Sequence, residues 1–124
     1  MTARLVKTML AMFVGMAVLA TLVRGGDPAR GKELFAKRCS GCHDPDKNKE
    51  GPHLRGVYGR TAGKAEGFNY SEGMKAATFA WDEQSLNRWL TDSETVVKDN
   101  DMAFRLADPL EREDVIAYLK LLSK

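Results

Sequence analysis

The residues best suited to chemistry lie together in the run Cys39-Ser40-Gly41-Cys42-His43. Two thiols separated by two residues can each form a thioether with one edge of a porphyrin, and the following residue can place an imidazole under the iron. Cys39 and Cys42 are the only cysteines among the 124 residues. The motif therefore predicts one covalently attached haem c, with His43 as an axial ligand of its iron.

Three other chemistries use a Cys-x-x-Cys pair: a redox dithiol, half of a zinc site and a local disulfide. A redox dithiol normally opens a helix after a strand, whereas this motif closes an amphipathic segment and is followed by His43. A zinc site would need ligands that the chain lacks, since it has one other histidine and no other cysteine. The context therefore favours haem attachment over all three.

An iron that exchanges electrons without binding substrate needs its sixth coordination site closed, and methionine is a usual partner of histidine. Four of the six methionines lie within the first 16 residues, which leaves Met74 and Met102. Met102 lies in a loop-like stretch from which it could reach back across a haem held near His43, and Met74 lies in an expected helix. Spacing favours Met102 and leaves Met74 open. The other histidine, His53, is expected to be peripheral, on the same side of the haem as His43.

Four segments with helical patterning could position these groups. Each begins after a side chain that caps helices well, and the caps are Asp27, Ser71, Asp82 and Asp108. The first helix should end near Cys39 and the second should run through Ala77. In the last helix Pro109 takes the first position and Glu111 the capping-box position. Apolar stripes in the third and last helices are formed by Leu86, Trp89 and Leu90, and by Val115, Tyr118, Leu119 and Leu122.

The stretches 44–67 and 91–107 lack helical or strand periodicity and are expected to be long loops. Loops of this length in a small domain need a ligand to enclose, which again favours a bound cofactor. No internal repeat and no strand-like alternation is present. The expected fold class is therefore all-α.

The composition is that of one globular domain, with 44% hydrophobic and 29% charged residues and a formal charge of +2. Nothing in it points to nucleic acid. The N-terminus carries Arg4 and Lys7 before an uncharged run over 8–23, which predicts a signal peptide over 1–20. The alternative is an uncleaved anchor to about residue 24, with a membrane tether through 8–23. Both place the domain, residues 27–124, in the periplasm or otherwise outside the cytoplasm.

From Gly31 to the C-terminus the sequence resembles the class I cytochromes c, of the mitochondrial type and its bacterial periplasmic relatives. The motifs that carry the resemblance fall in family order along the chain. They are Cys39-Ser40-Gly41-Cys42-His43, Gly51-Pro52-His53-Leu54-Arg55-Gly56, Gly59-Arg60, Gly67-Phe68-Asn69-Tyr70, Trp81 and Glu111-Arg112-Glu113-Asp114-Val115-Ile116-Ala117-Tyr118-Leu119.

The resemblance implies a small class I cytochrome c fold, in which Gly31 and Phe35 meet Val115 and Tyr118 where the terminal helices cross. It makes Met102 the sixth ligand and lets the carbonyl of Pro52 accept a hydrogen bond from His43. Arg60, Tyr70 and Trp81 would surround the haem propionates, because a buried carboxylate needs donors or a cation.

The function implied is that of a monomeric, non-enzymatic one-electron carrier between respiratory or photosynthetic partners. Such partners would be a membrane cytochrome complex and a terminal oxidase or reductase. Two alternatives remain. The first is a membrane-tethered haem subunit of an oxidase or reductase, and the second is a peroxide- or gas-reactive haem protein if Met102 is not bound.

The chain departs from the family around Met102. Lys98-Asp99-Asn100-Asp101 stands where the family usually has Pro-Gly-Thr-Lys. We therefore expect the loop that carries Met102, called the methionine loop below, to be looser than in the family. Trp89 stands where the family commonly has a tyrosine whose hydroxyl contacts the methionine sulfur, so we expect that donor to be lost. Along this loop only Lys98 offsets the acids Asp92, Glu94, Asp99 and Asp101, which predicts a mixed surface and weak electrostatic steering of partners.

Overall fold

The computed structural model describes residues 25–124, and the expected signal peptide or anchor lies outside the described residues. Five helices follow one another: α1 Pro28–Arg38, α2 Glu72–Ala76, α3 Glu83–Thr91, α4 Ser93–Val96 and α5 Pro109–Leu121. In the part that the structure describes, the extended backbone pairs only at an isolated bridge between Thr61 and Ala80. The expected all-α class is confirmed.

The helix starts lie where the caps predict them. The carboxylate of Asp27 accepts hydrogen bonds from the backbone N–H groups of Ala29 and Arg30 at the start of α1. The hydroxyl of Ser71 accepts from Met74 N at the start of α2. These bonds satisfy N–H groups that have no partner within their own helix, so the position of each start is encoded locally.

A reciprocal capping box forms at α3. The Asp82 carboxylate accepts from Ser85 N at 2.7 Å, and the Ser85 hydroxyl accepts from Asp82 N at 2.8 Å. At α5, where the sequence pattern suggested a capping box with Glu111, the Asp108 carboxylate accepts from Leu110 N at 2.8 Å. In the capping box of α3, Ser85 therefore occupies the position that glutamate usually takes.

The stretch 91–107 was expected to be loop throughout, but it contains the single-turn helix α4. Asp92 caps this turn by accepting from Glu94 N, and the Ser93 hydroxyl accepts from Phe104 N at 3.1 Å. A four-residue helix is too short to produce a hydrophobic period, and this one depends on a contact with a distant part of the loop.

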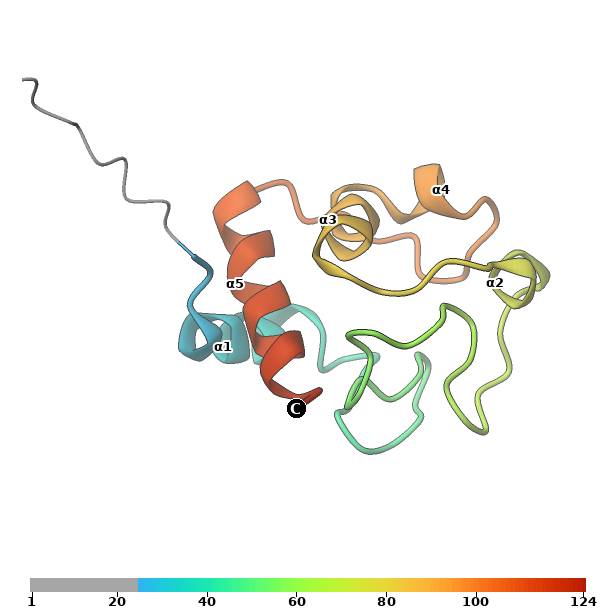
Figure 1. Cartoon of the computed structure of the whole chain (residues 1–124), viewed down its shortest axis with the longest axis horizontal. Coiled ribbons are helices and arrows are strands. Elements are labelled where there is room, and N and C mark those ends of the chain that lie inside the picture. The colour runs from blue at the N-terminus through green and yellow to red at the C-terminus, as the bar shows by residue number, and fades with distance from the viewer. Residues whose placement is uncertain (1–24) are drawn as a thin grey trace, which may run out of the picture.

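Helices α1 and α5, the first and last of the described chain, cross and pack against each other (Figure 1). A β-carbon on Gly31 would overlap the carbonyl oxygen of Asp114 and lie 2.9 Å from Tyr118 Cβ, so the close approach requires glycine. Next along α1, the rings of Phe35 and Tyr118 meet edge to face with their centroids 5.4 Å apart. The crossing expected from the resemblance is present.

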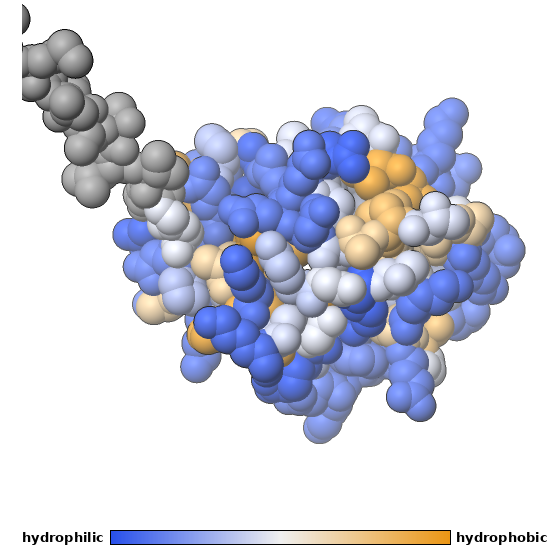
Figure 2. Space-filling view, in the orientation of Figure 1, coloured by the Kyte–Doolittle hydropathy of each residue, from blue (hydrophilic) through white to orange (hydrophobic). Residues whose placement is uncertain are grey.

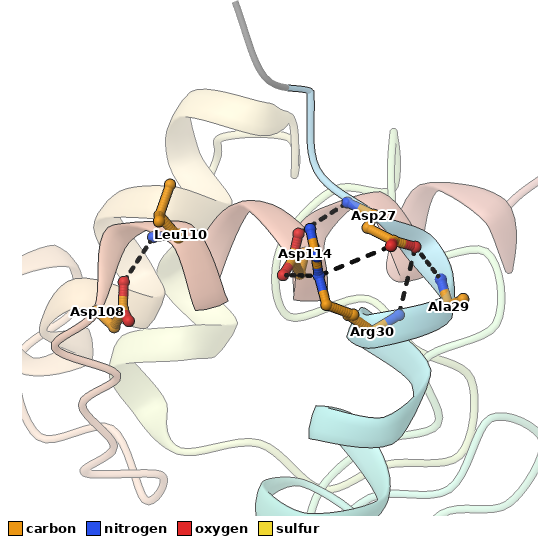
Figure 3. A network of polar contacts seen from close by, with 6 residues as sticks. All are labelled: Asp27, Ala29, Arg30, Asp108, Leu110 and Asp114. Carbon is orange, nitrogen blue, oxygen red and sulfur yellow. Dashed lines mark hydrogen bonds and ion pairs between the residues drawn. The ribbon is translucent and has the colours of Figure 1, made fainter.

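A polar network closes the outer end of this crossing (Figure 3). The buried carboxylate of Asp114 accepts from Asp27 N at 2.7 Å through one oxygen and pairs with Arg30 Nε at 3.1 Å through the other. Because both oxygens have donors, the carboxylate can be buried within α5. The network fixes the start of α1 against the first turns of α5.

The buried apolar residues form one cluster contributed by all the longer elements. Val115, Tyr118 and Leu119 of the predicted stripe on α5 are buried together with Ile116, whereas Leu122 is only partly buried. Figure 2 shows a mostly hydrophilic outer face with small hydrophobic areas, one of them beside α4. None of the helices within residues 25–124 combines the length and the apolar character that a membrane span requires.

Candidate haem site

A cavity of about 190 Å³ lies inside the apolar cluster, between α1, α3, α5 and the long loops. The eight residues that the sequence analysis assigned to a haem site come from separate parts of the chain, and all eight line this one cavity. They are Cys39, Cys42, His43, Pro52, Arg60, Tyr70, Trp81 and Met102. Most of the remaining wall is apolar and includes Phe35, Val57, Leu86, Leu90, Val115 and Leu119. The wall thus suits a mainly apolar group with a few polar ends.

His43 is oriented by its neighbours. Its Nδ1 lies 2.8 Å from the carbonyl oxygen of Pro52, and a β-carbon on Gly51 would overlap the imidazole ring. A carbonyl only accepts hydrogen bonds, so Nδ1 carries the proton and Nε2 keeps a free lone pair. Burial lowers the pKa of His43, opposed by the bond to Pro52, and so favours this neutral form. The imidazole is prepared to bind a metal through Nε2.

Cys39 follows the last residue of α1, and its thiol is held away from water. Burial raises the pKa of Cys39 to about 11, against a smaller opposing effect of Arg38. A redox dithiol needs the opposite shift, towards a stabilised thiolate at a helix N-terminus. Cys39 and Cys42 are not joined by a disulfide. Among residues 25–124, no group of three or more His, Cys, Asp and Glu side chains is arranged to hold a metal ion. The raised pKa of Cys39 is therefore the opposite of what a redox dithiol needs.

Arg60 carries the clearest sign of a missing partner. Its Nη2 donates to the carbonyl of His53 at 3.1 Å, but its buried Nε has no hydrogen-bond partner in the described structure. Burial lowers the pKa of Arg60, so its charged form lacks full compensation. An anionic group in the cavity would supply both the acceptor and the opposite charge. Haem, with its two propionates, fits this requirement.

Tyr70 and Trp81 form the same part of the wall. The hydroxyl oxygen of Tyr70 accepts from Ala65 N at 3.0 Å, which leaves its proton available for an acceptor in the cavity. Trp81 packs edge to face between Phe79 and Trp89, with centroid distances of 5.0 and 5.2 Å. This aromatic row holds the indole of Trp81 at the cavity.

Both candidate methionines line the cavity, and only one has a polar contact to its sulfur. Met74 is buried in α2, whereas the sulfur of Met102 accepts a hydrogen bond from the indole Nε1 of Trp89 at 3.1 Å. The expectation that Trp89 removes the donor to the methionine sulfur is therefore wrong. The indole N–H reaches the same sulfur that a tyrosine hydroxyl was expected to contact, because the larger ring of Trp89 packs against Trp81 and points its N–H at Met102.

The methionine loop, residues 97–104, is held by side-chain hydrogen bonds at the place where the family usually has a Pro-Gly turn. Asn100 is 7% exposed, lines the cavity and bonds to the backbone on both sides of itself. Sequence reasoning missed Asn100 and the contact between Trp89 and Met102. An asparagine in a polar loop and a tryptophan on an apolar stripe have commoner roles, and spacing did not distinguish these two from the rest.

The acidic residues near this loop are less free than the sequence suggested. Arg105 pairs with Asp92 at 2.7 Å, so Lys98 is not the only base facing these acids. Glu94 bonds to Asp99 N and to the Asn100 amide. The remaining histidine, His53, contacts the side chain of Asn48 at 2.8 Å and does not line the cavity.

Comparison with known proteins agrees with this geometry. A sequence model of the cytochrome c family matches residues 28–123. Cytochrome c of Chlamydomonas reinhardtii is 42% identical over 99 residues, which are 77% of this chain and 88% of that protein. Cytochrome c-550 of Novispirillum itersonii is 43% identical over 111 residues, covering 78% of this chain and 99% of that protein.

Among solved structures, cytochrome cH from Methylobacterium extorquens superposes with a TM-score of 0.74 at 41% identity, covering 77% of this chain and 99% of the other. The chain therefore belongs to the cytochrome c family of haem-binding electron carriers.

Proposed function

We propose that this chain is a monohaem one-electron carrier, with haem c attached through Cys39 and Cys42 and its iron ligated by His43 and Met102. The observation that carries the proposal is the meeting of these four residues in one cavity with the partnerless Nε of Arg60. When bound, the haem supplies an iron that alternates between the ferrous and ferric states. The protein contributes burial, ligation and orientation.

The residues divide the work by position. The thiols of Cys39 and Cys42 would hold one edge of the haem, and Nε2 of His43 would bind the iron, with Pro52 fixing the tautomer. The sulfur of Met102 would close the sixth site, polarised by the indole of Trp89. Arg60, Tyr70 and Trp81 also line the cavity and would surround the haem propionates with hydrogen-bond donors and a positive charge. A closed sixth site leaves electron transfer as the chemistry that remains.

The cellular setting proposed is the periplasm or another compartment outside the cytoplasm. The uncharged run over 8–23 after Arg4 and Lys7 supports export, by a cleaved signal peptide or by an anchor. The partners would be a membrane cytochrome complex as donor and a terminal oxidase or reductase as acceptor, with the chain acting as a monomer. The mature mass of the purified protein separates the cleaved form from the anchored one.

Substitution of the two methionines tests the ligation. Ferric haem bound by methionine has a weak long-wavelength charge-transfer band, which Met102→Ala should abolish. Met74→Leu, which keeps an apolar side chain of similar size in the cavity wall, should retain the band. The reduced Met102→Ala protein should also bind carbon monoxide rapidly, because its sixth site is open.

The opposite pattern would refute the assignment. A band that survives Met102→Ala and disappears in Met74→Leu would make Met74 the ligand. Rapid binding of carbon monoxide to the unmodified ferrous protein would show an open iron, and a peroxide- or gas-reactive function would then replace electron carriage.

A further inference from the structure

The methionine loop contains two non-glycine residues with left-handed backbone. Asp99 has a φ of 56° and Ala103 a φ of 44°. Aspartate adopts this conformation more readily than most residues, whereas alanine has no side-chain hydrogen bond with which to offset it. Such residues persist where the surrounding structure holds them in place. Because Ala103 directly follows Met102, whatever holds this backbone also determines where the methionine lies.

Asn100 provides the central restraint. Its Oδ1 accepts from Met102 N and from Ala103 N, both at 3.0 Å. Its Nδ2 donates to the carbonyl of Val97 at 2.8 Å and to Glu94 Oε2 at 3.1 Å. The amide thus uses both donors and accepts two bonds, which is its full capacity. No other residue type of this size can make all four contacts.

Glu94 connects this restraint to α4. Its second oxygen, Oε1, accepts from Asp99 N at 2.7 Å, so a single carboxylate binds two consecutive residues of the loop. The helix turn that carries Glu94 is itself fastened to the far end of the loop, where the Ser93 hydroxyl accepts from Phe104 N. The contacts form a closed set around Met102, and charge-assisted bonds from a carboxylate are among the stronger ones.

We propose that Glu94 and Asn100 form a clamp that holds the Met102 sulfur at the cavity wall and protects the iron from competing ligands. The inference rests on the proposed ligation by Met102. Glu94 and Asn100 are positioning residues, since they act through the backbone of the methionine loop. The clamp replaces the rigid Pro-Gly turn that this chain lacks, so the loop is not left loose by that substitution.

Imidazole binding to the ferric protein tests the clamp, because imidazole must displace the methionine to reach the iron. Glu94→Ala and Asn100→Ala should each bind imidazole about tenfold more tightly than the unmodified protein. Glu94→Gln, which keeps one acceptor oxygen, should fall between them and the unmodified protein. The matched controls are Glu83→Ala and Asn69→Ala, two exposed residues whose side chains do not line the cavity, and they should leave the affinity unchanged.

A second measurement separates positioning from general stabilisation. Amide hydrogen exchange at Met102 and Ala103 should accelerate in Glu94→Ala and stay slow in Glu83→Ala. If the clamp variants lose unfolding free energy but bind imidazole like the unmodified protein, the clamp does not guard the iron and the inference is wrong. A ferric spectrum of the unmodified protein without the methionine band overturns both the ligation and the clamp. A band with unchanged imidazole affinity in the variants overturns the clamp alone.

Discussion

At the scale of single residues, the site is determined by hydrogen bonds whose direction is unambiguous. The carbonyl of Pro52 fixes the proton of His43 on Nδ1, and the indole of Trp89 can only donate to the sulfur of Met102. Each bond sets an electronic property of an atom that we propose as an iron ligand. Nε2 of His43 becomes a better donor to a metal, and the Met102 sulfur becomes a weaker one.

The contact between Trp89 and Met102 predicts an effect on the reduction potential. A donor to the sulfur withdraws electron density and favours the ferrous state, so Trp89→Phe should lower the potential by about 20 to 60 mV, the equivalent of one ordinary hydrogen bond. Protein-film voltammetry measures the change. Phe79→Leu alters the same aromatic row without touching the sulfur and should shift the potential much less. A potential that stays constant or rises in Trp89→Phe would contradict this role.

The sequence predicted some site residues from their own spacing and others only through family resemblance. Cys39, Cys42 and His43 follow from their own spacing, because thioether attachment needs neighbours in the chain. Arg60, Tyr70 and Trp81 could not be derived from any pattern and came from family resemblance alone, since their meeting depends on how the long loops fold. The donor to Met102 was missed because a tryptophan on an apolar stripe most often serves the core.

At the scale of elements, caps and close packing place the helices. The starts of α1, α2, α3 and α5 were predictable because a cap and its N–H partners lie within a few residues of each other. The single turn of α4 was not predictable, since it depends on the contact between Ser93 and Phe104. Local chemistry thus positions the long helices, and tertiary contacts add the short one.

The crossing of α1 and α5 should be sensitive to one methyl group. Gly31→Ala places a β-carbon against the backbone carbonyl of Asp114, which cannot move without displacing α5. We expect the free energy of unfolding to fall by about 1 to 3 kcal/mol. Gly25→Ala, whose β-carbon would meet no atom within 4 Å, is the matched control. Denaturant titration of the haem-loaded proteins measures both, and equal stabilities would show that the helices can separate without cost.

The capping box of α3 predicts part of the response to acid. Hydrogen bonds from the backbone and side chain of Ser85 hold the pKa of Asp82 below its ordinary value of 3.8. The stabilisation is present above the unfolded-state pKa and is lost as the pH falls through the folded-state pKa. Between pH 5 and pH 2, Asp82→Asn should therefore lose less unfolding free energy than Glu83→Gln does. An acid response identical in the two variants would contradict this assignment.

At the scale of the whole molecule, the cofactor completes the core. The cavity of about 190 Å³ is lined by residues of the main apolar cluster, among them Phe35, Leu86 and Val115. Without a group in this cavity, these apolar side chains lose the packing contacts that a filled core provides. The fold and the cofactor site are therefore not separable parts of this protein.

Removal of the covalent link tests this dependence. The double variant Cys39→Ala/Cys42→Ala, purified without haem, should lose its near-ultraviolet circular dichroism and its cooperative denaturant transition. The haem-loaded unmodified protein is the reference. A haem-free variant that unfolds cooperatively at the same denaturant concentration would show that the protein alone fills its core.

The bond between Asp27 N and Asp114 joins positions 87 residues apart. Closing a chain loop of that length costs about 4 kcal/mol of entropy beyond a constant. All but two of the cavity-lining residues, Val115 and Leu119, lie within that loop. Closing this one loop therefore brings together nearly all the residues of the cavity wall. A group that binds only to the assembled cavity stabilises the closed loop and so offsets part of this entropy cost. The contact between Asp27 and Asp114 is thus coupled to binding in the cavity, although neither residue lines it.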